Sequence, residues 1–167
     1  GAQALLSMAK LYAGLLETEK LKNTLLQLLK VHGSKGIDKY IVTLVNDERV
    51  IERTENKALA VIVDACRYMV TSAVNNFDKL DVLKVLIATH QFEEAEAFLS
   101  EHKFVLNYVT AEMFENWILA LCKSDKNIHK AFDLYTKLAE AEKSKGDVVS
   151  LFVPLSKKCF QPMVQAI

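Results

Sequence analysis

The chain has 167 residues, of which 51% are hydrophobic and 25% are charged, so it can bury a core of its own and keep a solvated surface. Lysine plus arginine and aspartate plus glutamate both number 21, and the resulting net charge of zero excludes a strong general attraction to nucleic acid. No apolar run approaches the roughly 20 residues that cross a bilayer, and without net repulsion self-association stays open.

Helix-forming residues dominate the chain, which contains only five glycines and two prolines. Apolar residues recur at three- and four-residue spacing, as on one face of a helix. In chain order, this pattern predicts helices over 4–16, 19–31, 37–51, 54–75, 77–89, 92–102, 110–123 and 128–143, with a last segment after residue 147. Within 37–51 the run IVTLV is also compatible with a strand. Four aromatic residues of the last two helices fit the seam between helices better than an exposed row; they are Phe114, Trp117, Phe132 and Tyr135.

Two of these helices have informative patterns. In the first, the larger apolar residues share one face; they are Leu5, Met8, Leu11, Tyr12 and Leu15. The fourth, with Thr54 as a candidate N-cap, carries apolar residues on more than one face. We therefore expect the fourth helix to be central and contacted from two directions.

The second half of the chain contains a weak internal repeat of about 36 residues, a period typical of stacked helical hairpins. When the two copies of the repeat are aligned, Ala95 corresponds to Ala131, Phe98 to Leu134 and Leu99 to Tyr135. A single hairpin cannot cover its own apolar face, so neighbours must stack. We expect an all-α fold of eight or nine helices: antiparallel hairpins stacked as a short right-handed α-solenoid. We also expect a single domain over 1–167, in which 1–2 is a cleavage scar, and we expect the chain to be a fragment of a larger protein.

Residues 110–160 resemble a pentatricopeptide-type repeat, and the tetratricopeptide fold is an equally fair comparison. The resemblance rests on Phe114, on the run ALCK at 120–123 and on AFDLY at 131–135. The turn at 124–127 is one residue longer than the family pattern, and the usual glycine and proline are missing. In RNA-reading members of the family, a polar residue of the first helix selects a base. Glu115 falls near that place, where Asn, Ser or Thr is usual, so no base code is read.

The sequence shows no motif for chemistry. HExxH, CxxC, a glycine-rich phosphate loop and GxSxG are all missing from the chain, so we expect no enzyme, no cofactor and no metal site. The four histidines are assigned structural roles; they are His32, His90, His102 and His129. The three cysteines are interpreted as buried, reduced thiols, which indicates an intracellular, reducing compartment; they are Cys66, Cys122 and Cys159.

Lysines gather at two places that are candidates for a binding surface. One group follows the second helix, around the loop of His32, and the other lies at the turn near residue 125. Cations near helix carboxyl ends are also favoured by the helix dipole alone, so both interpretations stay open. The candidate residues are Lys30, Lys35, Lys39, Glu115, Lys123, Lys126 and Lys130.

Two binding functions are compatible with this pattern. The first is a non-enzymatic scaffold that holds a helix or extended peptide of a protein partner on a helical-repeat surface. The second, implied by the resemblance alone, is a pentatricopeptide-type module for single-stranded RNA in organellar or cytoplasmic RNA metabolism. The chain has only three arginines, the side chain that stacks on bases and clamps phosphates, and this favours the first function.

Overall fold

The computed structural model describes residues 1–73, 75 and 77–145, and all regular structure in these residues is helical. The expectation of an all-α chain is confirmed for this part. The chain divides into two compact units, Gly1–Lys103 and Phe104–Ile167, and each is described by itself. The segment expected after residue 147, and Cys159 with it, lies outside the described residues.

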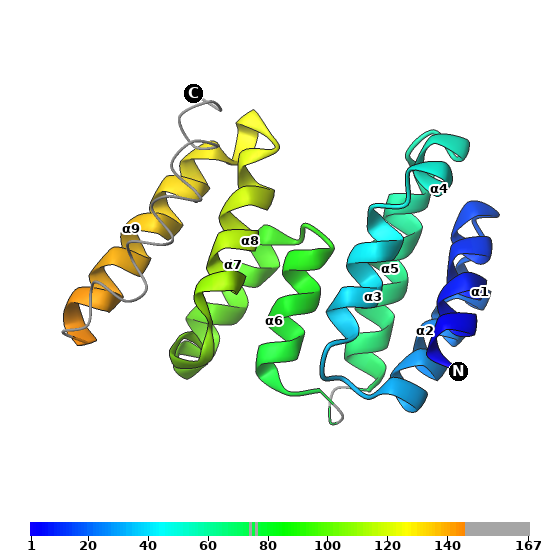
Figure 1. Ribbon diagram of the computed structural model, residues 1–167, viewed down its shortest axis with the longest axis horizontal. Helices are drawn as coiled ribbons and strands as arrows, with labels where there is room; N and C mark the ends of the chain where they lie inside the picture. Colours follow the sequence, from blue (N-terminus) through cyan, green and yellow to red (C-terminus); the bar gives the residue numbers. More distant parts are fainter. Residues whose placement is uncertain (74, 76, 146–167) are drawn as a thin grey trace. The chain divides into compact units, whose positions relative to one another are not determined.

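The first unit contains seven labelled α-helices (Figure 1). They are α1 (Ala2–Gly14), α2 (Thr18–His32), α3 (Ile37–Val45), α4 (Glu48–Arg53), α5 (Lys57–Ser72), α6 (Lys79–Ala88) and α7 (Phe92–Glu101). Helix α5 packs against α1, α2, α3 and α4, while α3 also packs against α6, and α6 against α7. The expectation of a central helix is therefore confirmed for Lys57–Ser72, the part of the predicted range 54–75 that is α-helical.

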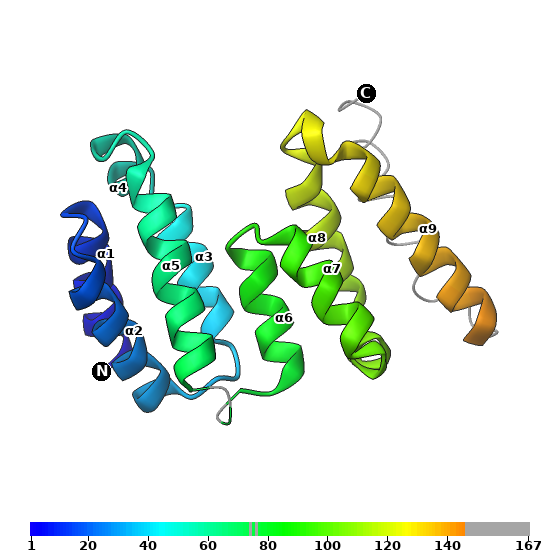
Figure 2. The same cartoon turned by 180° about the vertical axis from the view of Figure 1, so that it is seen from behind.

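Most of the buried apolar residues of this unit form one hydrophobic cluster, to which α2 and α5 contribute strongly. Leu21, Leu25 and Leu28 of α2 are almost fully buried, as are Ile62 and Met69 of α5. Seen from behind, α1, α2, α3 and α5 lie together and α6 follows α5 (Figure 2). Burial of these side chains supplies the main stabilisation, at about 1.5–3 kcal/mol for each fully buried leucine or isoleucine.

The predicted helix over 37–51 is wrong in one respect, because two helices, α3 and α4, occupy this range. The break falls at Asn46 and Asp47, where the side chain of Asp47 accepts a hydrogen bond from the amide of Val50 at 3.2 Å. Asparagine and aspartate favour helix ends because their short side chains satisfy free backbone amides. The run IVTLV is helical, so the strand alternative is excluded.

Thr54 is not the N-cap of α5, since that position is taken by Asn56, with a φ of 70°. Its hydroxyl nevertheless accepts a hydrogen bond from the amide of Ala58, in the first turn of α5, at 3.0 Å. The same hydroxyl donates to the carbonyl of Val50, in α4, at 2.9 Å. Thr54 therefore connects the end of one helix to the start of the next.

The second unit has a helical hairpin as its described part. A 3₁₀ segment (Lys103–Tyr108) leads into α8 (Ala111–Cys122), and a short 3₁₀ turn (Asp125–Asn127) connects it to α9 (Ile128–Lys145). Helices α8 and α9 pack against each other.

Four aromatic residues were expected to lie between these two helices. Phe114 and Trp117 are buried, Tyr135 is half-buried, and Phe132 is 37% exposed. The expectation is wrong for Phe132. It directly follows the fully buried Ala131, so it lies about 100° further around the helix.

Ala95 and Ala131, which the internal repeat aligned, are both fully buried. Each is therefore a core residue of its own unit.

Candidate interaction surface

The predicted lysines of the first unit lie around the turn that joins α2 to α3. Lys30, Lys35 and Lys39 are all exposed. Gly33 and Gly36 build this turn with φ values of 90° and 83°, a backbone region that residues with a Cβ rarely adopt. The structure therefore brings these three lysines to one end of the unit, as the sequence indicated.

This end of the unit also carries acidic groups. Asp81, at the start of α6, is 3% exposed, and the hydroxyl of Ser34 donates to its carboxylate at 3.4 Å. Burial raises the pKa of Asp81, as do Asp78 and Asp38, whereas Lys84 and the bond from Ser34 act against the rise. Mixed charges at this end mean that the three lysines do not form a uniformly positive patch.

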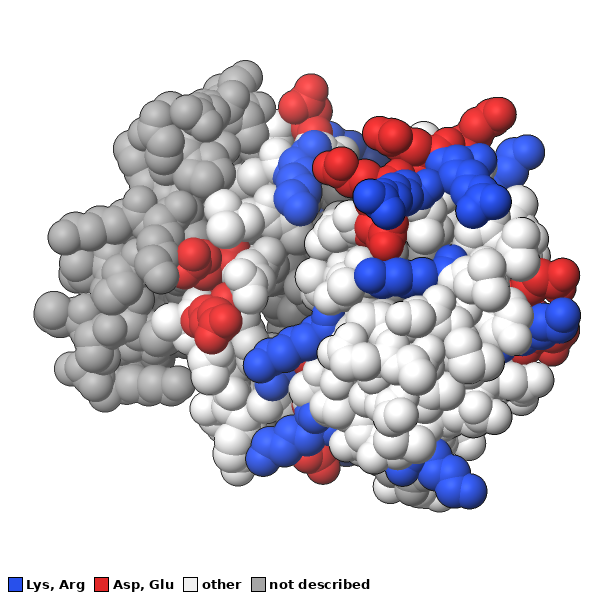
Figure 3. All heavy atoms as spheres, turned by 45° about the vertical axis from the view of Figure 1, so that its right-hand side comes forward, with Lys and Arg blue, Asp and Glu red and all other residues white. Residues whose placement is uncertain are grey.

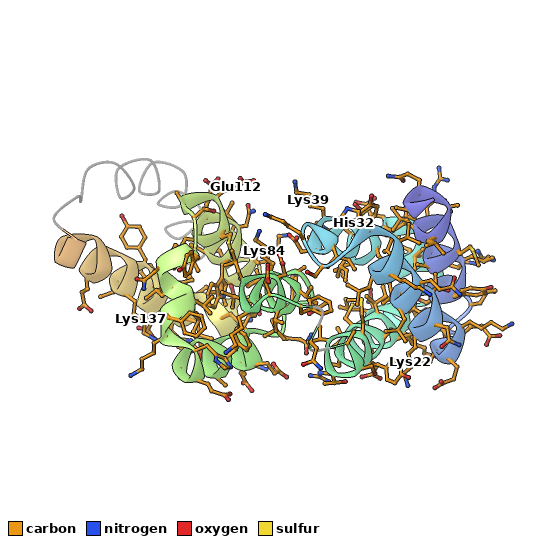
Figure 4. All side chains as sticks on the ribbon, turned by 90° about the horizontal axis from the view of Figure 1, so that it is seen from below. Lys22, His32, Lys39, Lys84, Glu112 and Lys137 are labelled. Carbon is orange, nitrogen blue, oxygen red and sulfur yellow. The ribbon has the colours of Figure 1, made fainter. Side chains whose placement is uncertain are left out.

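Lys22, in the first half of α2, lies apart from these three lysines. Lys22 forms an ion pair with Glu19 at 3.1 Å, and its ammonium lies 5.1 Å from the ring centre of Tyr68. Figure 4 shows Lys39 and Lys84 on one side of the unit and Lys22 on the other.

The remaining predicted residues belong to the second unit. Lys123 and Lys126 are exposed at the turn between α8 and α9, and Lys130 is half-buried in the first turn of α9. Glu115 is half-buried in α8, about 12 Å along the helix from Lys123. Three of these four residues therefore surround one turn, and Glu115 lies apart from them.

Sequence reasoning missed the most distinctive surface of the first unit, which is an exposed apolar face on α1. Met8 is 41% exposed, Leu11 54% and Leu15 52%, and Ala4 is also exposed. These four residues follow one another at helical spacing, so they form one stripe. We call this stripe the α1 face.

The side of α1 opposite this stripe covers the core. Its buried residues are Leu6, Ala9 and Ala13, which lie roughly 180° away from the α1 face around the helix. Alanine at two of these three positions lets α1 approach the core closely. The large apolar residues of the pattern are consequently left on the solvent side.

A shallow depression of about 530 Å³ adjoins the α1 face between α1 and α2. Its lining includes Ala4 and Leu5 of α1 and Gln27, Lys30 and Val31 of α2. Val31 is 61% exposed. The predicted residue Lys30 is therefore located at the edge of an apolar surface rather than in a basic patch.

The α1 face carries no charge. Lys10 is the only charged residue in α1, and its ammonium lies 3.4 Å from the carboxylate of Asp47. Figure 3 turns this side of the molecule forward and shows a broad area free of lysine, arginine, aspartate and glutamate, with charged side chains along its margins.

The predicted environment of the thiols is confirmed for one cysteine. Cys66 is fully buried, and burial raises the pKa of its thiol to about 12. Cys122 is half-buried rather than buried, and burial raises its pKa as well. Both are free thiols.

The histidines occupy different surroundings. The ring of His90 stacks on Phe92 with 5.4 Å between ring centres. His32 meets the ring of Tyr40 edge-on at 4.8 Å. Within the described ranges, no group of three or more His, Cys, Asp or Glu side chains has a geometry that could hold a metal ion.

None of the helices in the described part of the chain is both long and apolar enough to pass through a bilayer. Comparison with known proteins gave no match to a protein family, to a curated protein or to a solved structure.

Proposed function

We propose that this chain is a non-enzymatic binding module that holds a segment of a protein partner on a helical-repeat surface, and that the segment docks on the α1 face. The exposed stripe of Met8, Leu11 and Leu15 carries this proposal. A helix with apolar residues on both sides is normally contacted from both sides. Here the core covers one side, and the partner covers the other.

The expected energy is large enough for binding. Fully burying a leucine or methionine contributes about 1.5–3 kcal/mol, and each of the three larger residues is about half exposed. Covering them contributes roughly 1 kcal/mol each, and Val31 beside the depression adds a similar amount. The partner segment is a helix or an extended peptide with apolar side chains, because the α1 face offers few hydrogen-bonding groups.

The finer architecture belongs to the same proposal. The antiparallel hairpin of α8 and α9 and the pairwise packing of α1 with α2 and α6 with α7 are compatible with a short right-handed solenoid of the tetratricopeptide or pentatricopeptide type. An intracellular, reducing location is also proposed, and the free thiols of Cys66 and Cys122 support it.

The test compares three forms of the purified protein as bait in nuclease-treated lysate: the wild type, Leu11→Glu and Val42→Glu. Val42 lies on α3 and is 40% exposed, so it is a matched control for an added carboxylate on another helix. We expect wild type and Val42→Glu to capture the same protein, and Leu11→Glu to lose it. A partner retained by all three forms would show that the α1 face is not the docking surface.

Pentatricopeptide-type RNA binding stays a prediction. Filter binding to single-stranded RNA at low and physiological salt tests it, because binding through phosphate contacts weakens steeply with salt.

A further inference from the structure

The residues of the α1 face repeat at the spacing of a coiled-coil seam. Ala4, Met8, Leu11 and Leu15 are separated by four, three and four positions, which is the alternation of the two core positions in a heptad. All four are exposed. A partner helix that packs on this seam inserts its own apolar residues between them.

This seam is complementary to itself in the antiparallel direction. The spacing reads the same from either end, so a two-fold axis beside the midpoint of Ala9 and Lys10 aligns the seam with its own copy. Ala4 then faces Leu15 of a second copy, and Met8 faces Leu11. A small residue opposite a large one fills the space between two helices without voids.

The flanking positions on α1 itself are uncharged, and one cation from α2 lies beside them, because the ammonium of Lys20 is 5.8 Å from the ring centre of Tyr12. Leu5 and Tyr12 lie along one side of it, and Ser7 and Gly14 along the other. No heavy atom lies within 4 Å of the point where a Cβ of Gly14 would be, so a second helix backbone can approach there. In coiled coils, charges at such flanks select one partner over another, and the flank residues of α1 bring no like charges of their own against a second copy.

We infer that the segment held on the α1 face is α1 of a second copy of this chain, packed antiparallel. This inference rests on the proposed function and names its partner. A helix pair of this length is about 20 Å long and buries less than the roughly 800 Å² per partner of a stable interface. The adjoining depression with Leu5 and Val31 extends the contact, and the dimer is weak and dependent on concentration.

The first measurement is sedimentation equilibrium of the wild-type protein from low micromolar to about 500 µM. We expect reversible dimerisation, and a dissociation constant that rises at least about tenfold in Leu11→Glu and stays unchanged in Val42→Glu. All these positions are exposed, and circular dichroism confirms that the variants remain folded. A wild type that stays monomeric, or a dimer unaffected by Leu11→Glu, overturns the inference.

The second measurement tests the antiparallel register with the double variant Met8→Lys/Leu11→Glu. In the antiparallel pair, the new lysine of each copy faces the new glutamate of the other, so the double variant dimerises more strongly than either single variant. In a parallel pair lysine faces lysine and glutamate faces glutamate, so the double variant dimerises more weakly than either single variant; that result overturns the inference. If the chain does not dimerise but the lysate partner still depends on Leu11, the inference fails and the proposed function stands. If the chain dimerises but no lysate partner depends on Leu11, only the binding of a different protein is refuted.

Discussion

Thr54 connects α4 to α5 through one buried hydroxyl. It is 7% exposed, it donates to the carbonyl of Val50 and it accepts from the amide of Ala58. Thr54→Val preserves the shape of the side chain but leaves the amide of Ala58 without this acceptor. We expect the free energy of unfolding to fall by about 1–2 kcal/mol, measured by urea denaturation. Thr54→Ser keeps the hydroxyl and is the control; a larger loss in Thr54→Ser than in Thr54→Val would show that the methyl group, not the hydroxyl, is the main contribution.

Asp81 gives a prediction about pH. Its pKa is raised in the folded state, first of all by burial, so the native chain holds this proton more tightly than the unfolded chain. The associated stability is present below the unfolded pKa, near about 4, and is lost as pH rises through the folded pKa. Asn does not titrate. Asp81→Asn should therefore gain stability relative to wild type between about pH 3 and about pH 7.

Denaturation of both proteins at the two pH values measures this difference. A relative stability of Asp81→Asn that is unchanged or falls with rising pH would contradict the role given to burial. Asp38→Asn is a useful companion, because Asp38 is one of the groups that raise the pKa of Asp81. Removing that charge should make the stability of Asp38→Asn depend less on pH than the stability of the wild type does.

At the scale of residues, the sequence predicted chemistry better than exposure. It identified Cys66 as a buried thiol and Trp117 as a core residue, whereas the N-cap of α5 is Asn56 and not Thr54. It did not predict that Phe132 is exposed or that Cys122 is half-buried. Both lie at the edge of an apolar stripe, where a rotation of a few tens of degrees decides exposure, and periodicity does not fix the rotation that closely.

At the scale of elements, Asp47 lies at the break between α3 and α4 and is the N-cap of α4. One carboxylate oxygen caps α4 through the amide of Val50, and the other lies 3.4 Å from Lys10 of α1. Asp47→Ala removes both interactions and should cost about 1–2 kcal/mol of the free energy of unfolding. Asp47→Asn keeps the cap and loses only the ion pair, so it should cost less than about 1 kcal/mol. Chemical denaturation measures the free energy of unfolding of both variants. A loss in Asp47→Asn larger than this limit would make the ion pair the main contribution.

The helix pattern was predictable from spacing, and the break at 46–47 was the main error among the elements. Its signal is present in the sequence, since Asn46 and Asp47 are residues that favour helix ends. The apolar run before it continues in phase with Val50 and Ile51, so periodicity alone joins the two helices. Local capping prevailed over that continuity.

At the scale of the whole molecule, the α1 face is the feature that sequence reasoning could not locate. Leu11 and Leu15 formed the more conspicuous stripe, whereas the side that covers the core has Ala9 and Ala13. Periodicity gives the faces of a helix, but which face meets the core depends on how closely neighbouring helices approach. The predicted lysines could be named from sequence, yet the acidic groups near them come from α3 and α6 and needed the fold.

The most direct test of protein binding at the α1 face is site-specific photocrosslinking in cells. A photoreactive phenylalanine analogue replaces Leu11 in one form and Val42 in the other, both exposed apolar positions. The proposal predicts a protein adduct at position 11, including a dimer of this chain, and none at position 42. Crosslinking to RNA alone at position 11, or equal adducts at both positions, would contradict it.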